Sequence, residues 1–383
     1  MFTAPRYGHG TIADVFPSVL AALDVPGETD RLGLTGALEG IDRVAVLLVD
    51  GLGAHQLDAH RELAPTLSGA DRARTIETGF PSTTAVSLGS LGTGLAPGGH
   101  GITGYLMRLP GYDRPFAPLS WRLHGAGEKT DLRTEFTPEG AQPAATVFER
   151  AAAAGLAVTR VAPGYQATSG LTRAVLRGGE FTPAFSAGDL AAGTVLALQT
   201  GGPGIVYAYH GDLDLTGHAR GPDSAAWRAE LAHVDLLVAQ IVAGLPAGAA
   251  LVVTADHGMV EVRDPIDLDA EEVFGQEVAM IGGEPRARHV YTLPGAAERV
   301  ARRWADRLGP DYLVCTGAEA IETGWFGEVA ETVRGRIGDV LALPTGDGAL
   351  LRRATEPVQS RLIGHHGSLT EVERRIPLLV FRS

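Results

Sequence analysis

The sequence predicts an α/β fold in which helices flank both faces of a mostly parallel sheet. Three apolar runs end abruptly at polar residues, which is typical of strands that are buried on both faces. These runs span residues 43–49, 205–209 and 250–254. Segments of helical composition separate the runs, and strands that alternate with helices along a chain form parallel sheets.

Length, charge and cysteine content limit the number of domains, the cellular location and the kinds of partner that we expect. A chain of 383 residues offers two to three domains, or one large α/β domain with insertions. Its single cysteine, Cys315, cannot form an internal disulfide, and the first ten residues lack a basic segment followed by an apolar run. We therefore expect a cytoplasmic protein with no membrane partner. The formal charge of −13 argues against polymeric nucleic acid as a partner, because binding it requires a basic face.

The elements can be predicted in chain order up to the third apolar run. Residues 1–40 contain one helix near 17–23 and pack on the main domain. The first strand, 43–49, delivers Asp50 to its carboxyl end, where ligands gather in open α/β sheets. Residues 101–142, rich in Gly and Pro, form an irregular loop around Trp121, before a helix at 144–153 and a strand at 157–161. After the second run, residues 210–218 read as a polar loop and 223–243 as a long helix.

Beyond Gly258 the regular alternation of strands and helices gives way to several short strands. Strands are predicted at 289–292, 312–315 and 340–343 around an amphipathic helix at 296–308, and a strand at 376–381 returns to the main sheet. The predicted organisation is a main core of residues 1–258 and 345–383 with an α+β cap insertion at 259–344.

A hydroxyl-rich stretch lies where a turn hands over to a helix. Phe80-Pro81 cannot continue a regular element, and the run after it has helical spacing. A hydroxyl at a helix start lies among free backbone N–H groups, which suits a phosphate. Composition alone leaves Ser82, Thr83 and Thr84 as rival nucleophiles.

This stretch, with Thr93-Gly94-Leu95 and His100-Gly101-Ile102 after it, resembles the nucleophile motif of one branch of the alkaline phosphatase superfamily, the type I phosphodiesterases and nucleotide pyrophosphatases. Four more blocks of that family recur in the same order. They are Val49-Asp50-Gly51, Asp214-Leu215-Thr216-Gly217-His218, Thr254-Ala255-Asp256-His257-Gly258 and Gly364-His365-His366-Gly367. The resemblance implies an alkaline-phosphatase-like fold, and a gapless alignment puts the nucleophilic threonine on Thr84.

The resemblance also implies two divalent ions per chain. The first metal site would consist of Asp214, His218 and His366, and the second of Asp50, Asp256, His257 and the Thr84 oxygen. Carboxylates and imidazoles are the ligands expected for zinc or manganese. Such a pair of ions can clamp the entering and leaving oxygens of a displacement at phosphorus. The implied reaction is hydrolysis of a phosphodiester through a phosphothreonine intermediate.

The chain departs from the family pattern after the nucleophile. The family asparagine that donates to a phosphoryl oxygen corresponds to Ser87, a shorter donor to which we assign substrate binding. The family lysine before the threonine is Thr83. In size and location the chain is most similar to cytosolic actinobacterial enzymes that act on cyclic di-AMP. We therefore predict a small nucleotide diester as substrate, cyclic di-AMP converted to pApA and then AMP, with adenine held by the cap and the loop around Trp121.

Two other functions fit the same motifs. A phosphonoacetate-type C–P hydrolase uses the same seven positions, and a non-catalytic nucleotide or metal sensor could retain the fold. For several neighbouring residues we expect a structural role and no part in catalysis. His365 is a neighbour of a metal ligand, His100 fixes its loop by hydrogen bonds, and His210 and Asp212 are solvated groups near the loop that carries Asp214 and His218. Trp121 and Tyr105 could stack on a base or pack locally. The sequence does not set the oligomeric state.

Overall fold

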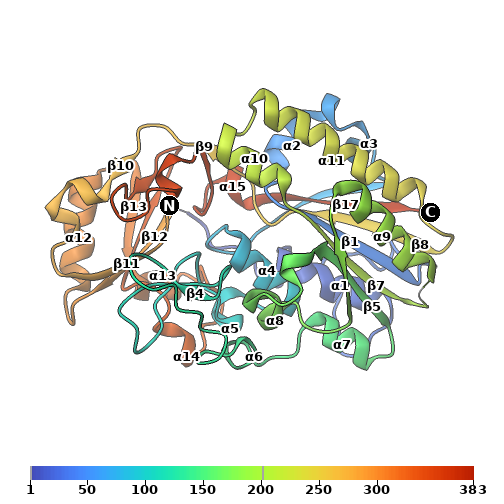
Figure 1. Ribbon diagram of the computed structural model, residues 1–383, viewed down its shortest axis with the longest axis horizontal. Helices are drawn as coiled ribbons and strands as arrows, with labels where there is room; N and C mark the ends of the chain where they lie inside the picture. The colour runs from blue at the N-terminus through green and yellow to red at the C-terminus, as the bar shows by residue number, and fades with distance from the viewer. Residues whose placement is uncertain (1, 201) are drawn as a thin grey trace.

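The computed structural model describes residues 2–200 and 202–383 and contains a central seven-stranded sheet (Figure 1). In spatial order the strands are β2 (Arg72–Glu77), β17 (Arg375–Arg382), β8 (Ala249–Thr254), β1 (Arg43–Val49), β7 (Gly204–His210), β5 (Ala157–Pro163) and β6 (Glu180–Ala184). The five strands from β8 to β6 are parallel, whereas β17 runs antiparallel to both its neighbours. The predicted mostly parallel sheet is confirmed.

The register of the three central strands places their carboxyl ends at one edge of the sheet. Val49 of β1 pairs with His210 of β7, and Leu48 pairs with Thr254 of β8. Every residue of β1 after Arg43 is buried, because both faces of the sheet are covered by helices. Polar residues that follow β1, β7 and β8 therefore emerge side by side.

Helices form a layer on each face of this sheet (Figure 1). The layer drawn above the sheet includes α9 (Ala187–Thr200), α10 (Asp212–Arg220) and α11 (Ala225–Ala243). The layer drawn below it includes α1 (Val15–Ala22), α4 (Thr84–Thr93), α7 (Val147–Ala153) and α8 (Gly170–Val175). In α11 the buried apolar residues recur at helical spacing, so one face of the helix is in the core.

A second sheet of four antiparallel strands lies beside the main one, on the left of Figure 1. Its strands, in spatial order, are β11 (Val278–Glu284), β12 (Ala287–Thr292), β14 (Val340–Pro344) and β13 (Tyr312–Thr316). Helix α12 (Ala297–Leu308) shares an apolar cluster with this sheet through Val300 and Trp304. The short strand β15 (Leu350–Leu351) pairs with β10 (Ile266–Asp267), so segments beyond residue 344 associate with this unit. The division into a core and a cap at 259–344 stays a prediction.

One predicted loop is a helix. Residues 210–218 were expected to be irregular because they are polar, but Asp212–Arg220 form α10. Asp212 and Asp214 lie in its first turn, where carboxylates favour the positive end of the helix dipole. Among the described residues, no helix has both the length and the apolar character that crossing a bilayer requires.

Candidate active site

The carboxyl ends of neighbouring strands bring together the first group of predicted residues. Asp50 follows β1 directly, and Asp256 lies just beyond β8. The Tyr209 hydroxyl of β7 donates a hydrogen bond to Asp50 Oδ2 (2.5 Å), and the Gly51 N–H donates to Asp256 Oδ1 (3.0 Å). His257 Nε2 lies 3.5 Å from Asp50 Oδ1 and 3.3 Å from Asp256 Oδ2. We call Asp50, Asp256 and His257 the Asp50 cluster.

Thr84 is the first residue of α4, and its hydroxyl faces the Asp50 cluster. Thr84 Oγ1 lies 3.2 Å from His257 Nε2. Thr83, the residue before the helix, has extended backbone, and Gly94 ends the helix with a φ of 74°. The hydroxyl therefore lies at the positive end of the helix dipole, where backbone N–H groups without intrahelical partners favour an anion.

Helix α10 and a distant loop supply a second group. Asp214 and His218 lie one turn apart on α10, with His218 Nε2 3.4 Å from Asp214 Oδ2. His366 Nε2 lies 3.3 Å from His218 Nε2. The Nδ1 atoms of these histidines lie 2.7 Å and 2.8 Å from the carbonyl oxygens of Gly364 and Ser82, so Nε2 of each is directed into the group. We call Asp214, His218 and His366 the Asp214 cluster.

The two clusters adjoin each other. The rings of His257 and His366 stack with their centroids 3.5 Å apart. Gly51 has a φ of 76°, and a Cβ atom there would lie 3.0 Å from the Cα of Asp214, so glycine lets α10 approach the end of β1. Within each cluster the possible ligand atoms all lie within 4.8 Å of one another. The structure thus brings all six predicted aspartate and histidine residues to one site, beside Thr84.

Burial gives this site unusual electrostatics. Burial raises the pKa of Asp50 well above its ordinary value, and the charge of Asp256 adds to the rise. Burial also raises the pKa of Asp214 and of Asp256 to about 7 each, helped by the charge of Asp50 and of Asp214 respectively. The histidines shift the other way: burial lowers the pKa of His257 to about 4 and that of His366 well below its usual value. Neutral imidazoles and crowded carboxylates are the forms that a cation would stabilise.

The donor set fits divalent cations. Among the described residues, Asp50 Oδ1, Asp214 Oδ1 and Asp256 Oδ2 are buried without a hydrogen-bond partner. An unpaired buried carboxylate oxygen is costly, and a metal ion would satisfy it. Imidazole and carboxylate groups are the usual protein ligands of zinc. Either cluster could therefore hold such an ion.

Ser87 does not face the site. Its hydroxyl donates to the backbone carbonyl of Asp256 (2.8 Å) and lies 2.7 Å from Thr78 Oγ1, and its side chain is fully buried. This geometry holds the Asp256 backbone in place. The predicted contact between Ser87 and substrate has no support from this position.

Trp121 also has a packing role. Its indole is fully buried, stacks on Phe136 and donates a hydrogen bond to the Phe136 carbonyl (2.7 Å). Because no face of the ring is free, Trp121 packs locally, which is one of the two roles that its sequence context left open. That the cap and the loop around Trp121 hold adenine stays a prediction. His100, likewise buried, lies 3.1 Å from Ser90 Oγ and accepts a hydrogen bond from the Ile102 N–H.

A pocket of about 270 Å³ opens onto Thr84 and the Asp214 cluster. The pocket is lined by Thr84, by the Asp214 cluster and by residues from several other segments of the chain. The lining residues are Thr83, Thr84, Tyr105, Leu119, Asp214, His218, Glu284, Pro285, Gln359, Leu362, His365 and His366. Among these residues there is no Lys or Arg. Sequence reasoning missed Glu284, which follows Gly282-Gly283 at the end of β11 and carries no motif that would link it to the site.

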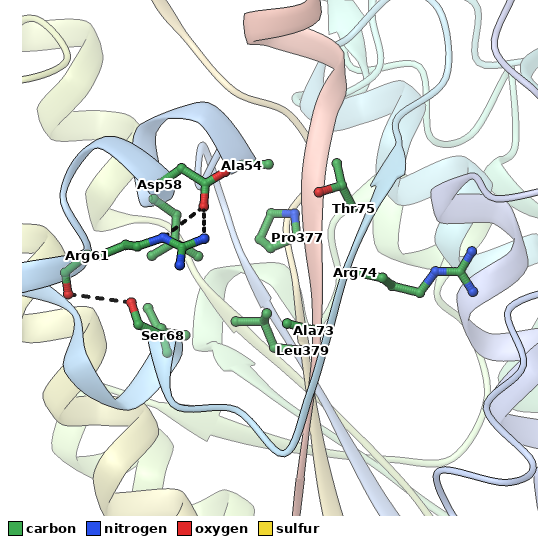
Figure 2. A pocket seen from close by; sticks show the side chains of 11 residues that line it. Ala54, Asp58, Arg61, Ser68, Ala73, Arg74, Thr75, Pro377 and Leu379 are labelled. Atoms are coloured by element: carbon green, nitrogen blue, oxygen red, sulfur yellow. Dashed lines mark hydrogen bonds and ion pairs between the residues drawn. The ribbon is translucent and has the colours of Figure 1, made fainter.

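Another hollow lies at the edge of the main sheet, between α2 (Ala54–Ala59), α3 (Pro65–Ser68) and strands β2 and β17. Figure 2 shows Asp58 and Arg61 paired with each other there and Arg74 pointing away. None of the predicted site residues lines this hollow. Arg61 is paired with Asp58, and Arg74 donates a hydrogen bond to the Leu32 carbonyl outside the hollow, so we assign the hollow no catalytic role.

The fold and the paired clusters together define a metal-dependent hydrolase with an alkaline-phosphatase-like architecture. A sequence profile of the type I phosphodiesterase / nucleotide pyrophosphatase family matches residues 44–369, and the chain belongs to this family. A search of curated protein sequences found no match.

Solved structures with a similar fold include two kinds of enzyme. Murine ectonucleotide pyrophosphatase / phosphodiesterase 5 is 19% identical with a TM-score of 0.68, over 89% of this chain and 88% of that one. An inactive variant of that protein in complex with AMP has a TM-score of 0.67 at 19% identity, over 88% and 87% of the two chains. Phosphonoacetate hydrolase from Sinorhizobium meliloti, in complex with phosphonoacetate, is 20% identical with a TM-score of 0.64, over 88% of this chain and 89% of that one. At these identities the likeness establishes the fold.

Proposed function

We propose that this protein is a two-metal phosphodiesterase in which Thr84 is the nucleophile. The observation that carries the proposal is the position of the Thr84 hydroxyl at a helix start, between the Asp50 cluster and the pocket beside the Asp214 cluster. The Asp50 cluster would hold one divalent ion together with Thr84, and the Asp214 cluster the other, with zinc or manganese the ions that suit these donors. When bound, such ions supply positive charge to the phosphoryl oxygens and favour ionisation of a hydroxyl.

The residues of the chain would carry out the reaction in two steps. Thr84 Oγ1 forms a bond to phosphorus as the bond to the leaving alcohol breaks, which gives a phosphothreonine ester. Water attacks the same phosphorus in a second step, and the Thr84 hydroxyl is regained. The first turn of α4 presents backbone N–H groups to the phosphoryl oxygens throughout.

The substrate we propose is a small nucleotide diester, and in particular cyclic di-AMP, cleaved to pApA and then to AMP. The size of the pocket and the formal charge of −13 support a small substrate over polymeric nucleic acid. Tyr105, Leu119 and Leu362 line the pocket and would hold a base, whereas the indole of Trp121 is fully buried and could not. The similar murine structure in complex with AMP is in keeping with an adenine nucleotide. A cytoplasmic location, which suits this substrate, is part of the proposal.

The absence of Lys and Arg from the residues that line the pocket favours a diester over phosphonoacetate, although the fold of a phosphonoacetate hydrolase is similar. The carboxylate of phosphonoacetate would need a cationic partner away from the metal ions. The residues that line the pocket include the acids Asp214 and Glu284 and no Lys or Arg. Each phosphodiester group carries one negative charge, which the metal ions would meet at the reacting phosphorus, and it requires no such partner.

Chromatography of reaction products tests the proposal. Protein loaded with manganese or zinc is incubated separately with cyclic di-AMP, cyclic di-GMP, pApA and phosphonoacetate. We expect pApA and then AMP from cyclic di-AMP, slower cleavage of cyclic di-GMP, and no activity after chelation. Release of acetate and phosphate from phosphonoacetate, with all three nucleotides intact, would favour the C–P hydrolase, and inactivity on every substrate would favour a metal or nucleotide sensor.

A further inference from the structure

A tyrosine near the carboxyl end of β7 makes the two oxygens of Asp50 different from each other. Tyr209 is buried, and its hydroxyl donates a hydrogen bond to Asp50 Oδ2 (2.5 Å). Asp50 Oδ1 is also buried but has no hydrogen-bond partner among the residues that the structure describes. One oxygen of this carboxylate is therefore held by the protein, and the other is left for a cation.

The free oxygen of Asp50 is the one that faces the rest of the Asp50 cluster. Asp50 Oδ1 lies 3.5 Å from His257 Nε2, which in turn lies 3.3 Å from Asp256 Oδ2 and 3.2 Å from Thr84 Oγ1. Asp256 Oδ2 is likewise buried without a partner in the described part of the chain. An ion among these atoms would meet Oδ1 of Asp50, whereas Oδ2 is occupied by Tyr209.

The central sheet fixes the donor and the acceptor of this hydrogen bond relative to each other. Tyr209 pairs with Leu48 in the parallel register of β1 and β7, and the Asp50 N–H donates to the His210 carbonyl (2.9 Å). Gly211 leaves room for the hydroxyl, since a Cβ atom there would lie 3.0 Å from Tyr209 Oη. The hydrogen bond thus joins two backbone segments that are already paired.

The number of oxygens that Asp50 gives to an ion matters for the proposed reaction. A carboxylate with two free oxygens can bind a cation through one of them or through both. Binding through both would take up a coordination position that the Thr84 oxygen needs. A hydrogen bond to Oδ2 prevents this and stops the carboxylate from turning. Partners that hold a metal ligand in this way typically contribute roughly tenfold to a hundredfold to metal affinity or activity.

We propose that Tyr209 is a positioning residue, which makes Asp50 a ligand through one oxygen and so sets the affinity of the Asp50 cluster for its ion. The inference rests on the proposed function, in which this cluster holds one of two divalent ions together with Thr84. Because the hydroxyl acts through Asp50, its loss should weaken the binding of that ion and leave the ion of the Asp214 cluster in place.

The test measures metal binding directly. Tyr209→Phe removes the hydroxyl and keeps the ring. We titrate wild type and variant with Co²⁺ in competition with a chromogenic chelator, and record the visible spectrum of the bound cobalt, which reports its coordination geometry. We expect two ions per chain in the wild type. In Tyr209→Phe the dissociation constant of one ion should rise roughly tenfold or more, with an altered spectrum, while that of the other stays the same.

Tyr207→Phe is the matched control. Tyr207 lies two residues earlier on the same strand, and its buried hydroxyl has no hydrogen-bond partner among the described residues. Loss of that hydroxyl should leave both dissociation constants and the spectrum as in the wild type. Gly211→Ala is a second variant if Tyr209→Phe folds poorly. It keeps the Tyr209 hydroxyl but crowds it with a methyl group, so it should weaken the same ion.

The possible failures are distinguishable. Dissociation constants and spectra in Tyr209→Phe that equal those of the wild type would overturn the inference, and so would the same change in Tyr207→Phe. A wild type that binds fewer than two ions per chain would overturn the two-metal proposal itself, which the wild-type titration alone reveals.

Discussion

At the scale of single residues, the site is a set of buried groups that are stable together only when their charge is compensated. Asp50, Asp214 and Asp256 each keep one buried oxygen without a hydrogen-bond partner among the described residues. Burial lowers the pKa of His257 and of His366, so these imidazoles are neutral and can donate a lone pair. This arrangement costs stability, and bound cations would offset that cost.

Thr84→Ala should reduce turnover of bis(p-nitrophenyl) phosphate by roughly a thousandfold or more, because it removes the attacking oxygen. The six aspartate and histidine ligands remain, so the metal content measured by mass spectrometry should fall little. Thr83→Ala is the control, since Thr83 also lines the pocket. Loss of turnover in Thr83→Ala with activity retained in Thr84→Ala would show that the gapless alignment is wrong.

Asp50→Asn should abolish turnover for a different reason. The amide is neutral and a weaker metal ligand, although it could still accept the hydrogen bond from Tyr209. The measurement is activity at saturating manganese alongside metal stoichiometry. Turnover equal to wild type in metal-loaded Asp50→Asn would remove Asp50 from the site.

The motif residues could be predicted because each lies in a block that resembles a block of the family, and Asp50, Asp256 and His257 also follow apolar runs that predict strands. Ser87 could not be placed in the same way, since only the packing of α4 against the Asp256 backbone turns its hydroxyl away from the pocket. Glu284 could not be predicted at all. It reaches the site through the pairing of β11 with β12, more than sixty residues after Asp214 in the chain.

At the scale of elements, burial on both faces made the central strands predictable. The predicted strands at 43–49 and 250–254 differ by at most one residue from β1 and β8. The error at α10 has a physical cause: its mixture of Asp, Gly and His has little apolar periodicity, and only two of its residues, Leu213 and Gly217, are buried. Its helical form nevertheless matters, because one turn separates Asp214 from His218.

The buried ion pair of Arg286 and Glu373, which joins the β11–β12 hairpin to the main unit, gives a stability prediction. Arg286→Met leaves the buried carboxylate of Glu373 unpaired, so the free energy of unfolding should fall by about 3 to 5 kcal/mol. Arg173→Met is a matched control, because Arg173 makes the same two-point contact with Glu139 at the surface. That change should cost about 1 kcal/mol or less. Urea denaturation measures the free energy of unfolding of both variants. An equal decrease in the two would show that the buried pair of Arg286 and Glu373 stabilises the protein no more than a surface pair does.

At the scale of the whole molecule, metal ions and stability should be linked through pH. The carboxyls of Asp214 and Asp256 have a pKa of about 7 in the folded chain against 3.8 ordinarily. Their contribution to stability is complete below the lower value and is lost as the pH rises through about 7, because the folded state must then hold buried like charges. Burial of His257 has the opposite effect, because its lowered pKa makes the folded state more stable as the pH rises from about 4 to 6.5.

Chelated protein should therefore lose free energy of unfolding between pH 6.5 and about pH 8, and saturating metal should abolish most of that loss. Urea denaturation at the two pH values, with chelator and with manganese, measures both quantities. The same loss in the metal-loaded and the chelated protein would contradict the assignment of these carboxyls as metal ligands.

The most direct test of the central claim, that hydrolysis proceeds through Thr84 in two displacements, is the stereochemical course at phosphorus. The substrate is a phosphorothioate diester of one known configuration, hydrolysed by the metal-loaded wild type in water enriched in a heavy oxygen isotope. Each in-line displacement inverts phosphorus, so attack by Thr84 followed by attack by water predicts a product with net retention. A product with inverted configuration would mean that water attacks the substrate directly, and would contradict a covalent role for Thr84.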